Sequence, residues 1–454
     1  MSETTSKSTS RRDFLKNSGR IVAASALTAG IAPNLYAAGG DTIKLALVGC
    51  GGRGTGAASQ ALSVKNGRTK LVAMADVFQH RLDNSSKNLS KRGPEKVDVP
   101  KSRQFLGFEG YRKAMACLDK GDVVILGTPP AFRWVHFTEA IKRGLHVFME
   151  KPVTVDGPTT RRMIRLAKQA DQKNLKCGVG LMVRHCQGRQ ELKERIDSGE
   201  IGEILLMRGY RMGGRASACK RKGDNISDVL YQIQKFHSFL WASGGMYNDY
   251  YIHQIDELSW MKGAWPVEAH ALGGRHYRDD YVDQNLDTYD VEYTYPDGAR
   301  LFYQGRNISG CTGGFSSCVH GTKGSGIVSK SGHHPGRVCT YKGHKMAESD
   351  IIWRFPQREK SPYQLEWDDL IDAIRNDKPY NEVERGAISS MVSSMGRMAA
   401  HTGQVITFDQ MLNCPHEFAP NADKLTNDGP APVPAKADGT YPVPQPGKLK
   451  DREY

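Results

Sequence analysis

The 454-residue chain has 39% hydrophobic and 25% charged residues, proportions that are ordinary for soluble globular proteins. It is too long for a single hydrophobic core, so we expect two domains with extensions. The formal net charge is +14, but the basic residues are spread along the chain, without the dense, aromatic-interleaved basic stripe of a nucleic-acid-binding protein. We therefore expect no nucleic-acid partner; a mildly basic surface, or attraction to anionic polysaccharide, accounts for the charge.

Residues 1–40 have the features of a targeting segment. Ser10 to Lys16 reads SRRDFLK, which resembles the twin-arginine export consensus, and an apolar stretch from Ile21 to Ala32 follows it. This stretch is too short to span a bilayer comfortably, but the cleavage sites around Ala37 are imperfect, so an uncleaved membrane anchor stays open. We expect the twin-arginine export machinery as a partner and a periplasmic location, reached by export of the already folded chain.

The first predicted strand runs directly into a glycine-rich loop, because Ile43 to Gly56 reads IKLALVGCGGRGTG. Gly49, Gly51 and Gly54 have the G-x-G-x-x-G spacing. Gly52 and Arg53, which lie between the second and third of these glycines, are further candidate contacts to the cofactor. The first glycine permits a tight turn, the second lets a pyrophosphate approach the backbone, and the third lets the next helix pack on the strand. The N-terminal amides of that helix would attract anionic oxygens.

The second predicted strand, Thr69 to Ala75, ends in Asp76. This aspartate stands about 20 residues past the loop, where a carboxylate can bind a ribose 2′-hydroxyl group. Its charge would repel a 2′-phosphate, which favours NAD over NADP as the cofactor. Together with the glycine loop, Asp76 predicts a dinucleotide-binding α/β domain over residues 41–184.

Two more strand ends supply candidate cofactor contacts. The strand Asp122 to Leu126 leads into Thr128, Pro129 and Pro130, and the strand His146 to Met149 leads into Glu150 and Lys151. Doubly wound sheets bind ligands outside the carboxyl ends of their strands, so these residues should meet at one sheet edge. Lys151 is therefore a candidate for the nicotinamide end of the site.

Five motifs, in this order, resemble the Gfo/Idh/MocA family of oxidoreductases: GCGGRG, ADV, TPPAFRWVH, HVFMEKPV and GGMYNDYYIHQID. The resemblance covers about residues 42–412 and is closest to an exported branch of the family. It implies a Rossmann domain followed by a substrate domain, here residues 185–412, which is built on a large, mostly antiparallel open sheet and often forms dimers or tetramers. Residues 413–454 are rich in Pro and Lys and are expected to be an extended arm or a disordered tail.

The last of these motifs contains the candidate catalytic pair. If the segment is helical, Asp249 and His253 lie four residues apart on one face; in isolation, His253 would be taken for a packed helix residue. The resemblance implies instead that His253 is the catalytic base, with Asp249 orienting it and Lys151 polarising the reacting oxygen. Tyr251 stands where many relatives have glycine, and its phenol would narrow or reshape the pocket. His185, Tyr247 and Tyr251 are the neighbours among which another base would be sought.

No metal site is expected. His320, His333 and His334 lie in a glycine-rich segment but lack metal-ligand spacing, and hydride transfer to NAD needs no metal. The nine cysteines include no C-x-x-C pair, so we interpret them as mostly buried thiols, with Cys50 as a small filler in the glycine loop.

These observations together predict an NAD-dependent oxidoreductase that acts on a secondary hydroxyl of a carbohydrate substrate, namely a sugar, glycoside or cyclitol. Two alternatives stay open. One is a redox-assisted glycosidase resembling glycoside hydrolase family 109, for which the resemblance implies loss of the EKP lysine and histidine in place of Asp249. The other is a periplasmic carbohydrate-binding protein that has lost turnover.

Overall fold

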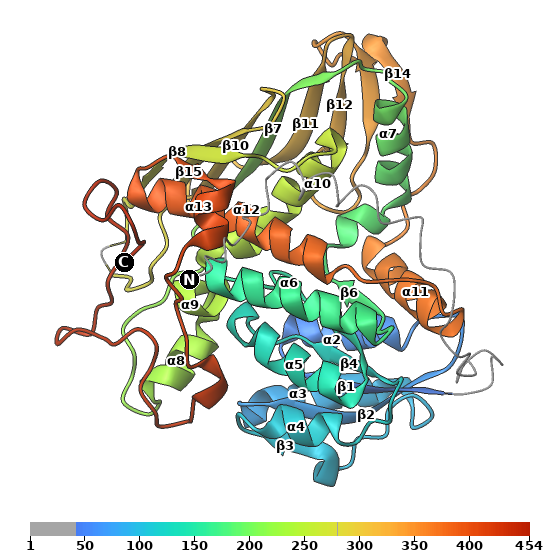
Figure 1. Cartoon of the computed structure of the whole chain (residues 1–454), viewed down its shortest axis with the longest axis vertical. Coiled ribbons are helices and arrows are strands. Elements are labelled where there is room, and N and C mark those ends of the chain that lie inside the picture. The colour runs from blue at the N-terminus through green and yellow to red at the C-terminus, as the bar shows by residue number, and fades with distance from the viewer. Residues whose placement is uncertain (1–41, 279) are drawn as a thin grey trace, which may run out of the picture. The chain divides into compact units, whose positions relative to one another are not determined.

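The computed structural model describes residues 42–278 and 280–454 (Figure 1). The expected targeting segment, residues 1–40, lies outside them. In the part of the chain that is described, no helix has both the length and the apolar character that crossing a membrane requires.

The first domain contains a six-stranded parallel sheet with the order β3-β2-β1-β4-β5-β6. Its strands are β1 (Ile43–Val48), β2 (Thr69–Asp76), β3 (Gln104–Leu106), β4 (Val123–Leu126), β5 (His146–Met149) and β6 (Cys177–Val179). The helices between them are α2 (Gly52–Ala61), α3 (Gln79–Leu89), α4 (Gly110–Met115), α5 (Arg133–Arg143) and α6 (Gly157–Gln172). This strand order is that of the dinucleotide-binding Rossmann fold, which confirms the prediction from the glycine loop.

Continuous apolar runs explain why these segments form a parallel sheet. All four residues of β4 are fully buried, and β1 buries every residue except Lys44. Strands that are covered by helices on both faces need such runs, whereas one-sided strands alternate. A late helix, α11 (Pro362–Arg375), returns to this domain and packs Trp367 against Phe148 at a ring distance of 4.4 Å. The chain therefore crosses back to its first sheet after completing the second.

The second domain contains a nine-stranded sheet with the order β14-β13-β12-β11-β7-β10-β9-β8-β15. Its strands are β7 (Ile204–Gly213), β8 (Glu268–Gly274), β9 (Thr288–Thr294), β10 (Arg300–Asn307), β11 (Gly314–Gly321), β12 (Gly324–Ser329), β13 (Cys339–Lys342), β14 (Ile351–Arg354) and β15 (Ile406–Thr407). Neighbouring strands are antiparallel except β7 and β10, which pair in parallel. This mixed, mostly antiparallel sheet confirms the expected fold class.

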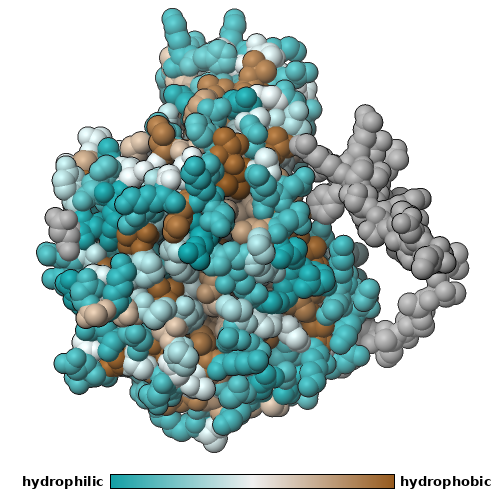
Figure 2. All heavy atoms as spheres, turned by 60° about the vertical axis from the view of Figure 1, so that its left-hand side comes forward, coloured by the Kyte–Doolittle hydropathy of each residue, from teal (hydrophilic) through white to brown (hydrophobic). Residues whose placement is uncertain are grey.

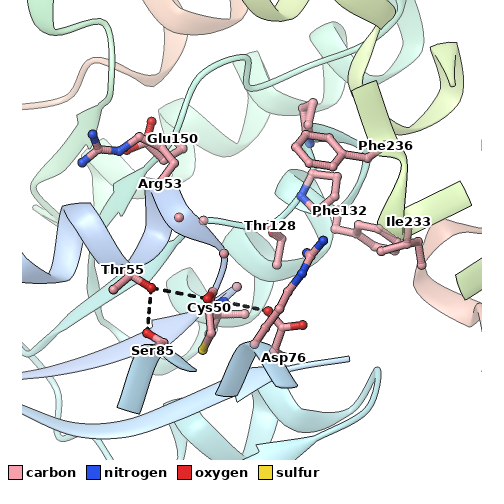
Figure 3. Close-up of a pocket in the computed structure, with 18 of the residues that line it drawn as sticks. Cys50, Arg53, Thr55, Asp76, Ser85, Thr128, Phe132, Glu150, Ile233 and Phe236 are labelled. Carbon is pink, nitrogen blue, oxygen red and sulfur yellow. Dashed lines mark hydrogen bonds and ion pairs between the residues drawn. The ribbon is translucent and has the colours of Figure 1, made fainter. Parts of the chain in front are cut away.

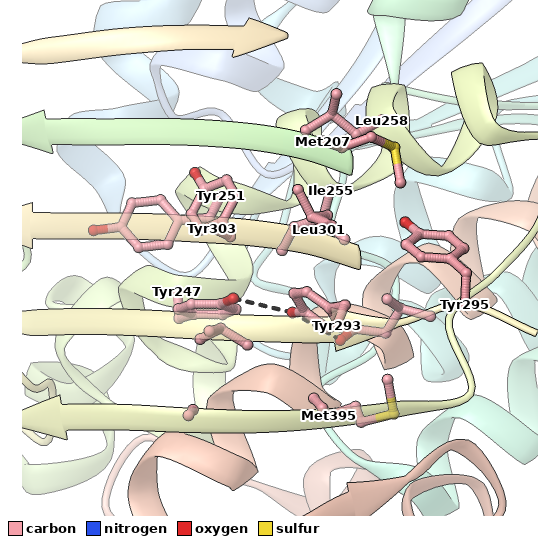
Figure 4. Close-up of a cluster of buried hydrophobic side chains, with 14 of the residues drawn as sticks. Met207, Tyr247, Tyr251, Ile255, Leu258, Tyr293, Tyr295, Leu301, Tyr303 and Met395 are labelled. Carbon is pink, nitrogen blue, oxygen red and sulfur yellow. Dashed lines mark hydrogen bonds between the residues drawn. The ribbon is translucent and has the colours of Figure 1, made fainter. Parts of the chain in front are cut away.

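The helices of this part of the chain are α7 (Gln187–Asp197), α8 (Asp228–Gln234), α9 (Leu240–Ser243), α10 (Ile252–Lys262), α12 (Val383–Thr402) and α13 (Phe408–Asn413). Helices α10 and α12 cover one face of the large sheet, and the core between them and the strands is rich in tyrosine (Figure 4). The hydroxyl groups of Tyr247 and Tyr293 lie 3.0 Å apart within it. Pairing of this kind lets a phenol be buried without leaving its hydroxyl unsatisfied.

Tyr251 belongs to this core and does not line the cavity described below, so the expectation that it narrows the substrate pocket is wrong. Its ring is 1% exposed, and its hydroxyl accepts a hydrogen bond from Asn307 Nδ2 at 2.9 Å. Space for the ring comes from Gly305, where a Cβ atom would stand 2.3 Å from the Tyr251 ring. The large residue at this position is therefore accommodated by the sheet side of the core.

Residues 413–454 follow α13 with little regular structure, but several of their side chains are buried. Phe418, Val433 and Tyr441 join a hydrophobic cluster with α8, α9 and the segment before them. Glu453 is 3% exposed and lies against Arg397 and His401 of α12. Glu417 also pairs with Arg162 of α6, so the tail is extended and packs against both domains.

Candidate active site

A cavity of about 750 Å³ lies at the carboxyl ends of β1, β2, β4 and β5. One part of its wall comes from the glycine loop, Asp76, the segment after β4 and the pair Glu150 and Lys151. The other part comes from β7, the end of α8, residues 236–237, the start of α10 and His333. The cavity therefore joins the predicted cofactor residues to the motif that contains Asp249 and His253.

The glycine loop has the shape that a pyrophosphate requires. Gly49 has φ of +93°, and a Cβ on Gly54 would stand 2.0 Å from the carbonyl oxygen of Gly49, so neither position tolerates a side chain. A Cβ on Gly51 or Gly52 would meet nothing within 4 Å. Gly51 is the N-cap of α2 and no side chain caps this helix, so its first amides are free to receive an anion.

Asp76 is held at the end of β2 by two backbone amides, and Figure 3 shows the one from Cys50. The N–H of Cys50 donates to Oδ2 at 2.7 Å, and the N–H of Phe78 donates to Oδ1 at 2.9 Å. Burial raises the pKa of Asp76, although the two amides and the Arg81 guanidinium favour its charged form. The thiol of Cys50 is buried and its pKa is also raised by burial, which suits a filler and not a nucleophile.

Arg53 and Glu150 form an ion pair on another side of the cavity, with 2.8 Å between Nε and Oε1 (Figure 3). The guanidinium of Arg53 also lies 4.9 Å from the ring centre of Tyr363. After β4, Thr128 Oγ1 lies 3.2 Å from His136 Nδ1, and Pro129 and Pro130 line the cavity beside it. All the predicted cofactor residues except Gly54 thus line one cavity. Gly54 lies outside the cavity wall and packs closely against the main chain of Gly49.

Lys151 and Asp249 meet at the junction of the two domains. Lys151 Nζ lies 3.3 Å from Asp249 Oδ1 and also donates to the main-chain oxygen of Asp249. The second carboxylate oxygen lies 2.9 Å from His237 Nε2. Burial opposes the charge of Asp249, but Lys151 and His237 outweigh it and hold the pKa of this carboxyl well below its ordinary value. Asp249 is therefore ionised and bridges two basic side chains.

His253 has no hydrogen bond to Asp249 in the described structure, which differs from the expected pairing. Its ring lies against that of His333, with 4.3 Å between ring centres and the planes tilted by 54°, and its buried Nδ1 has no hydrogen-bond partner among the described residues. The reason is local: Tyr247–Tyr251 form a π-helical turn, so residues 249 and 253 do not keep the same-face relation of a regular α-helix. Both side chains still line the cavity.

The surroundings of His253 keep its imidazole neutral. Burial lowers its pKa well below the ordinary value, and His333 and the cations Lys151, Arg211 and Arg189 lower it further. A neutral imidazole next to a lysine can accept a proton from a hydroxyl group that the lysine polarises. The arrangement is thus equipped for removing a proton from a bound alcohol.

The three fallback candidates for the base lie away from the cavity. Tyr247 and Tyr251 are in the tyrosine-rich core. His185 lies 2.6 Å from Asp369 and 3.3 Å from Glu382, and these acids raise its pKa to about 10 against the effect of burial. None of the three lines the cavity that holds Lys151.

Sequence reasoning missed several cavity residues: Arg211, Ile233, Phe236, His237, Tyr250 and Tyr363. His237 and Phe236 follow α8 in a segment without a motif. His333 was considered only as a metal ligand, and it reaches the site from a loop 80 residues after His253. Within residues 42–278 and 280–454, no group of three or more His, Cys, Asp or Glu side chains is arranged to hold a metal ion.

Comparison with known proteins agrees with the fold. The chain is 26% identical to the scyllo-inositol 2-dehydrogenase (NAD(+)) of Bacillus subtilis over 260 residues, which are 57% of this chain and 68% of that protein. It is 26% identical to an inositol 2-dehydrogenase of Corynebacterium glutamicum over 32% of this chain, and spans only 41% of that protein. The structure of scyllo-inositol dehydrogenase from Lactobacillus casei with bound NAD(H) and scyllo-inositol covers 81% of this chain and 99% of its own, with a TM-score of 0.59 and 22% identity.

Two family models match successive parts of the chain. The model for the oxidoreductase family with an NAD-binding Rossmann fold matches residues 43–181, and the model for the GFO/IDH/MocA C-terminal domain matches residues 189–326. Together they cover more than half of the 454 residues. The first spans the six strands of the parallel sheet, and the second spans β7 to β11 and the start of β12 in the nine-stranded sheet. The chain therefore belongs to the Gfo/Idh/MocA family of oxidoreductases and carries its NAD-binding Rossmann domain.

Proposed function

We propose that this protein is an NAD-dependent oxidoreductase that acts on a secondary hydroxyl group of a sugar, glycoside or cyclitol in the periplasm. The observation that carries the proposal is the shared cavity, in which the glycine loop and Asp76 lie together with Lys151, Asp249 and His253. Relatives that act on inositol support this class of substrate. When bound, NAD supplies the acceptor for the hydride that leaves the carbinol carbon.

The residues of the cavity would bind the cofactor, remove the hydroxyl proton and stabilise the charge on the substrate oxygen. The open backbone at Gly51 and Gly52 would receive the pyrophosphate, and the Asp76 carboxylate would bind the adenosine ribose. His253 would take the hydroxyl proton, since its low pKa keeps a nitrogen lone pair available at neutral pH. Lys151 would donate to the same oxygen and stabilise the negative charge that grows there.

The experiment is a comparison of His253→Ala with the wild type in single-turnover hydride transfer, using a carbon-deuterated substrate. We expect NAD binding to be unchanged and the rate to fall by about 10²- to 10⁴-fold, the range for losing a positioned base. His270→Ala is a matched control, because His270 is an exposed residue of β8 outside the cavity. Hydride transfer at the wild-type rate in His253→Ala would show that His253 only packs against its neighbours.

Two further measurements distinguish the alternatives. Release of an aglycone from an aryl glycoside, without net change of nicotinamide absorbance, would identify a redox-assisted glycosidase. Native mass spectrometry that finds a sugar ligand but no nucleotide would identify a binding protein. The ion pair of Lys151 with Asp249 favours net oxidoreduction, since the resemblance to glycoside hydrolase family 109 implies that those enzymes lack the lysine and carry histidine in place of Asp249.

We also propose export of the folded chain with its nucleotide, on the basis of Arg11 and Arg12 in the SRRDFLK motif. Replacing both arginines by lysine should leave active protein in the cytoplasm. Full periplasmic activity of this variant would refute the role of the motif.

A homo-oligomer, a dimer or tetramer, is the remaining part of the proposal. The face of the large sheet opposite α10 and α12 carries Leu272 and Phe302, which are 70% and 38% exposed. The face visible in Figure 2 is mostly hydrophilic, with apolar side chains in small patches. Sedimentation analysis of wild type and Leu272→Glu would test whether the sheet face forms the contact; a monomeric wild type would refute it.

A further inference from the structure

Arg211 stands in the wall of the cavity next to the candidate catalytic residues. It lies on β7, and its guanidinium carbon is 4.3 Å from the ring centre of Phe315 on β11. Its Nη1 donates to His333 Nε2 at 2.7 Å and lies 3.5 Å from the main-chain oxygen of Tyr250. Because the ring centres of His333 and His253 lie 4.3 Å apart, His333 connects Arg211 to the candidate base.

The charges at this end of the cavity are not balanced. Lys151 pairs with Asp249, and Arg53 pairs with Glu150. In the described part of the chain, no carboxylate lies within ion-pair distance of Arg211, whose contacts there are neutral. Arg211 is thus a cation in the cavity wall that has no anion from the protein.

The excess positive charge at this end of the cavity lowers the pKa of the two neighbouring histidines, His333 and His253. Burial, followed by Arg211, Arg189 and Lys151, lowers the pKa of His333 well below its ordinary value. His253 is affected in the same way. Both imidazoles are therefore neutral, and the electrostatic potential around them favours an incoming anion.

The shape of the site favours a carboxylate over a phosphate. Phe315 supports the guanidinium plane, and a guanidinium edge matches the two oxygens of a carboxylate. A phosphate dianion would call for several charged donors, but beside Arg211 the other cations at this end already hold carboxylates. The formal charge of +14 on the whole chain would also attract anionic substrates over longer distances.

We propose that the substrate is an acidic sugar or acidic cyclitol, and that Arg211 binds its carboxylate while a secondary hydroxyl faces Lys151 and His253. This inference rests on the proposed oxidoreductase function and narrows its substrate class. Uronic and aldonic acids are the simplest compounds with this chemistry. Arg211 acts here as a residue for substrate recognition, and the proton is still removed at His253.

The test uses the full-length protein with its nucleotide and matched pairs of substrates, glucose with glucuronate and galactose with galacturonate, which differ only in the oxidation state of C6. We expect the wild type to have a higher kcat/KM for the acid of at least one pair. Arg211→Gln should lower kcat/KM for the acid about 10- to 150-fold more than kcat/KM for its neutral partner, corresponding to a lost hydrogen-bonded charge contact. Any effect that acts through the pKa of His253 is shared by both substrates of a pair. Arg208→Gln is the matched control, because Arg208 is on the same strand and outside the cavity.

Calorimetry of glucuronate and glucose binding gives a readout that does not depend on turnover. Preferential binding of the acid, reduced in Arg211→Gln and by added salt, supports the proposal. Preference for the neutral sugars or for glucose 6-phosphate, equal losses for acid and neutral substrates in Arg211→Gln, or no binding of any acid would each overturn it. If acids bind but none is oxidised and no nucleotide is found, the proposed oxidoreductase function fails while the acid site stands.

Discussion

Glu453 is the tail residue whose replacement we expect to cost the most stability. Arg397, which is fully buried in α12, donates to both carboxylate oxygens, at 2.9 Å from Nε and 2.8 Å from Nη2. His401 Nδ1 lies 2.6 Å from Oε2, and its other ring nitrogen lies 3.0 Å from the Tyr289 hydroxyl. Replacing Glu453 by Gln keeps the shape but leaves the guanidinium of Arg397 without its counter-charge.

The magnitude follows from the pKa of Glu453. Burial opposes its charge, but Arg397 and His401 lower the pKa to about 2. Against an ordinary value of about 4.3, this difference of about two pH units corresponds to roughly 3 kcal/mol at neutral pH. Removing one partner of a buried ion pair typically costs about 3–5 kcal/mol, so we expect Glu453→Gln to lower the free energy of unfolding by that amount.

The assay is equilibrium unfolding in urea for the wild type, Glu453→Gln and the control Asp451→Asn, since Asp451 is an exposed acid of the same segment. A depressed carboxyl pKa stabilises the fold above the pKa of the unfolded chain and is lost as pH falls through the folded pKa. The difference between wild type and Glu453→Gln should therefore be constant above about pH 5 and shrink towards pH 2. A variant as stable as the wild type at pH 7 would refute the reasoning.

Further predictions concern the cavity. Asp76→Ser should narrow the preference for NAD over NADP in binding titrations; native protein holding NADP would contradict the role of Asp76. Lys151→Ala should weaken NAD binding and lower the hydride-transfer rate at least as much as His253→Ala does, measured by single turnover; an unaffected rate would exclude Lys151. Asp249→Asn should shift the acidic limb of the kcat/KM profile to lower pH, since it leaves the charge of Lys151 unbalanced and this cation lowers the pKa of His253; a shift to higher pH would contradict this.

The first domain could be predicted from sequence because its signals are local. The apolar run of β1, the three glycines and Asp76 lie within about 35 residues, and each has a direct backbone consequence. In the second domain, alternating apolar and polar residues over 203–210, 287–295 and 300–304 predict half-buried strands, which correspond to β7, β9 and β10. The parallel pairing of β7 with β10 joins Leu206 to Arg300, and no local pattern encodes contacts over that separation.

The sequence predicted which residues line the site better than it predicted which of them contact one another. Lys151, Asp249 and His253 come together in one cavity, but His237, Arg211 and His333 come from segments without a motif. The burial of Glu453 could not be predicted either, because a Pro- and Lys-rich tail has no periodicity that would mark a buried acid. In each case the missing information is a tertiary contact, such as Asp249 with His237, and not a local propensity.

The pairing of Asp249 with Lys151 changes the catalytic roles that Lys151, Asp249 and His253 would have. A carboxylate behind a histidine raises the histidine pKa and stabilises the imidazolium that forms when it takes a proton. Here the Asp249 carboxylate pairs with Lys151 and His237 and not with His253. Burial and the nearby cations lower the pKa of His253. A weaker base can complete proton removal only if the charge on the substrate oxygen is well stabilised, and Lys151 is the residue placed to do so. The role of Asp249 would then be to hold that ammonium group in position, and the lysine would carry more of the transition-state stabilisation than the histidine.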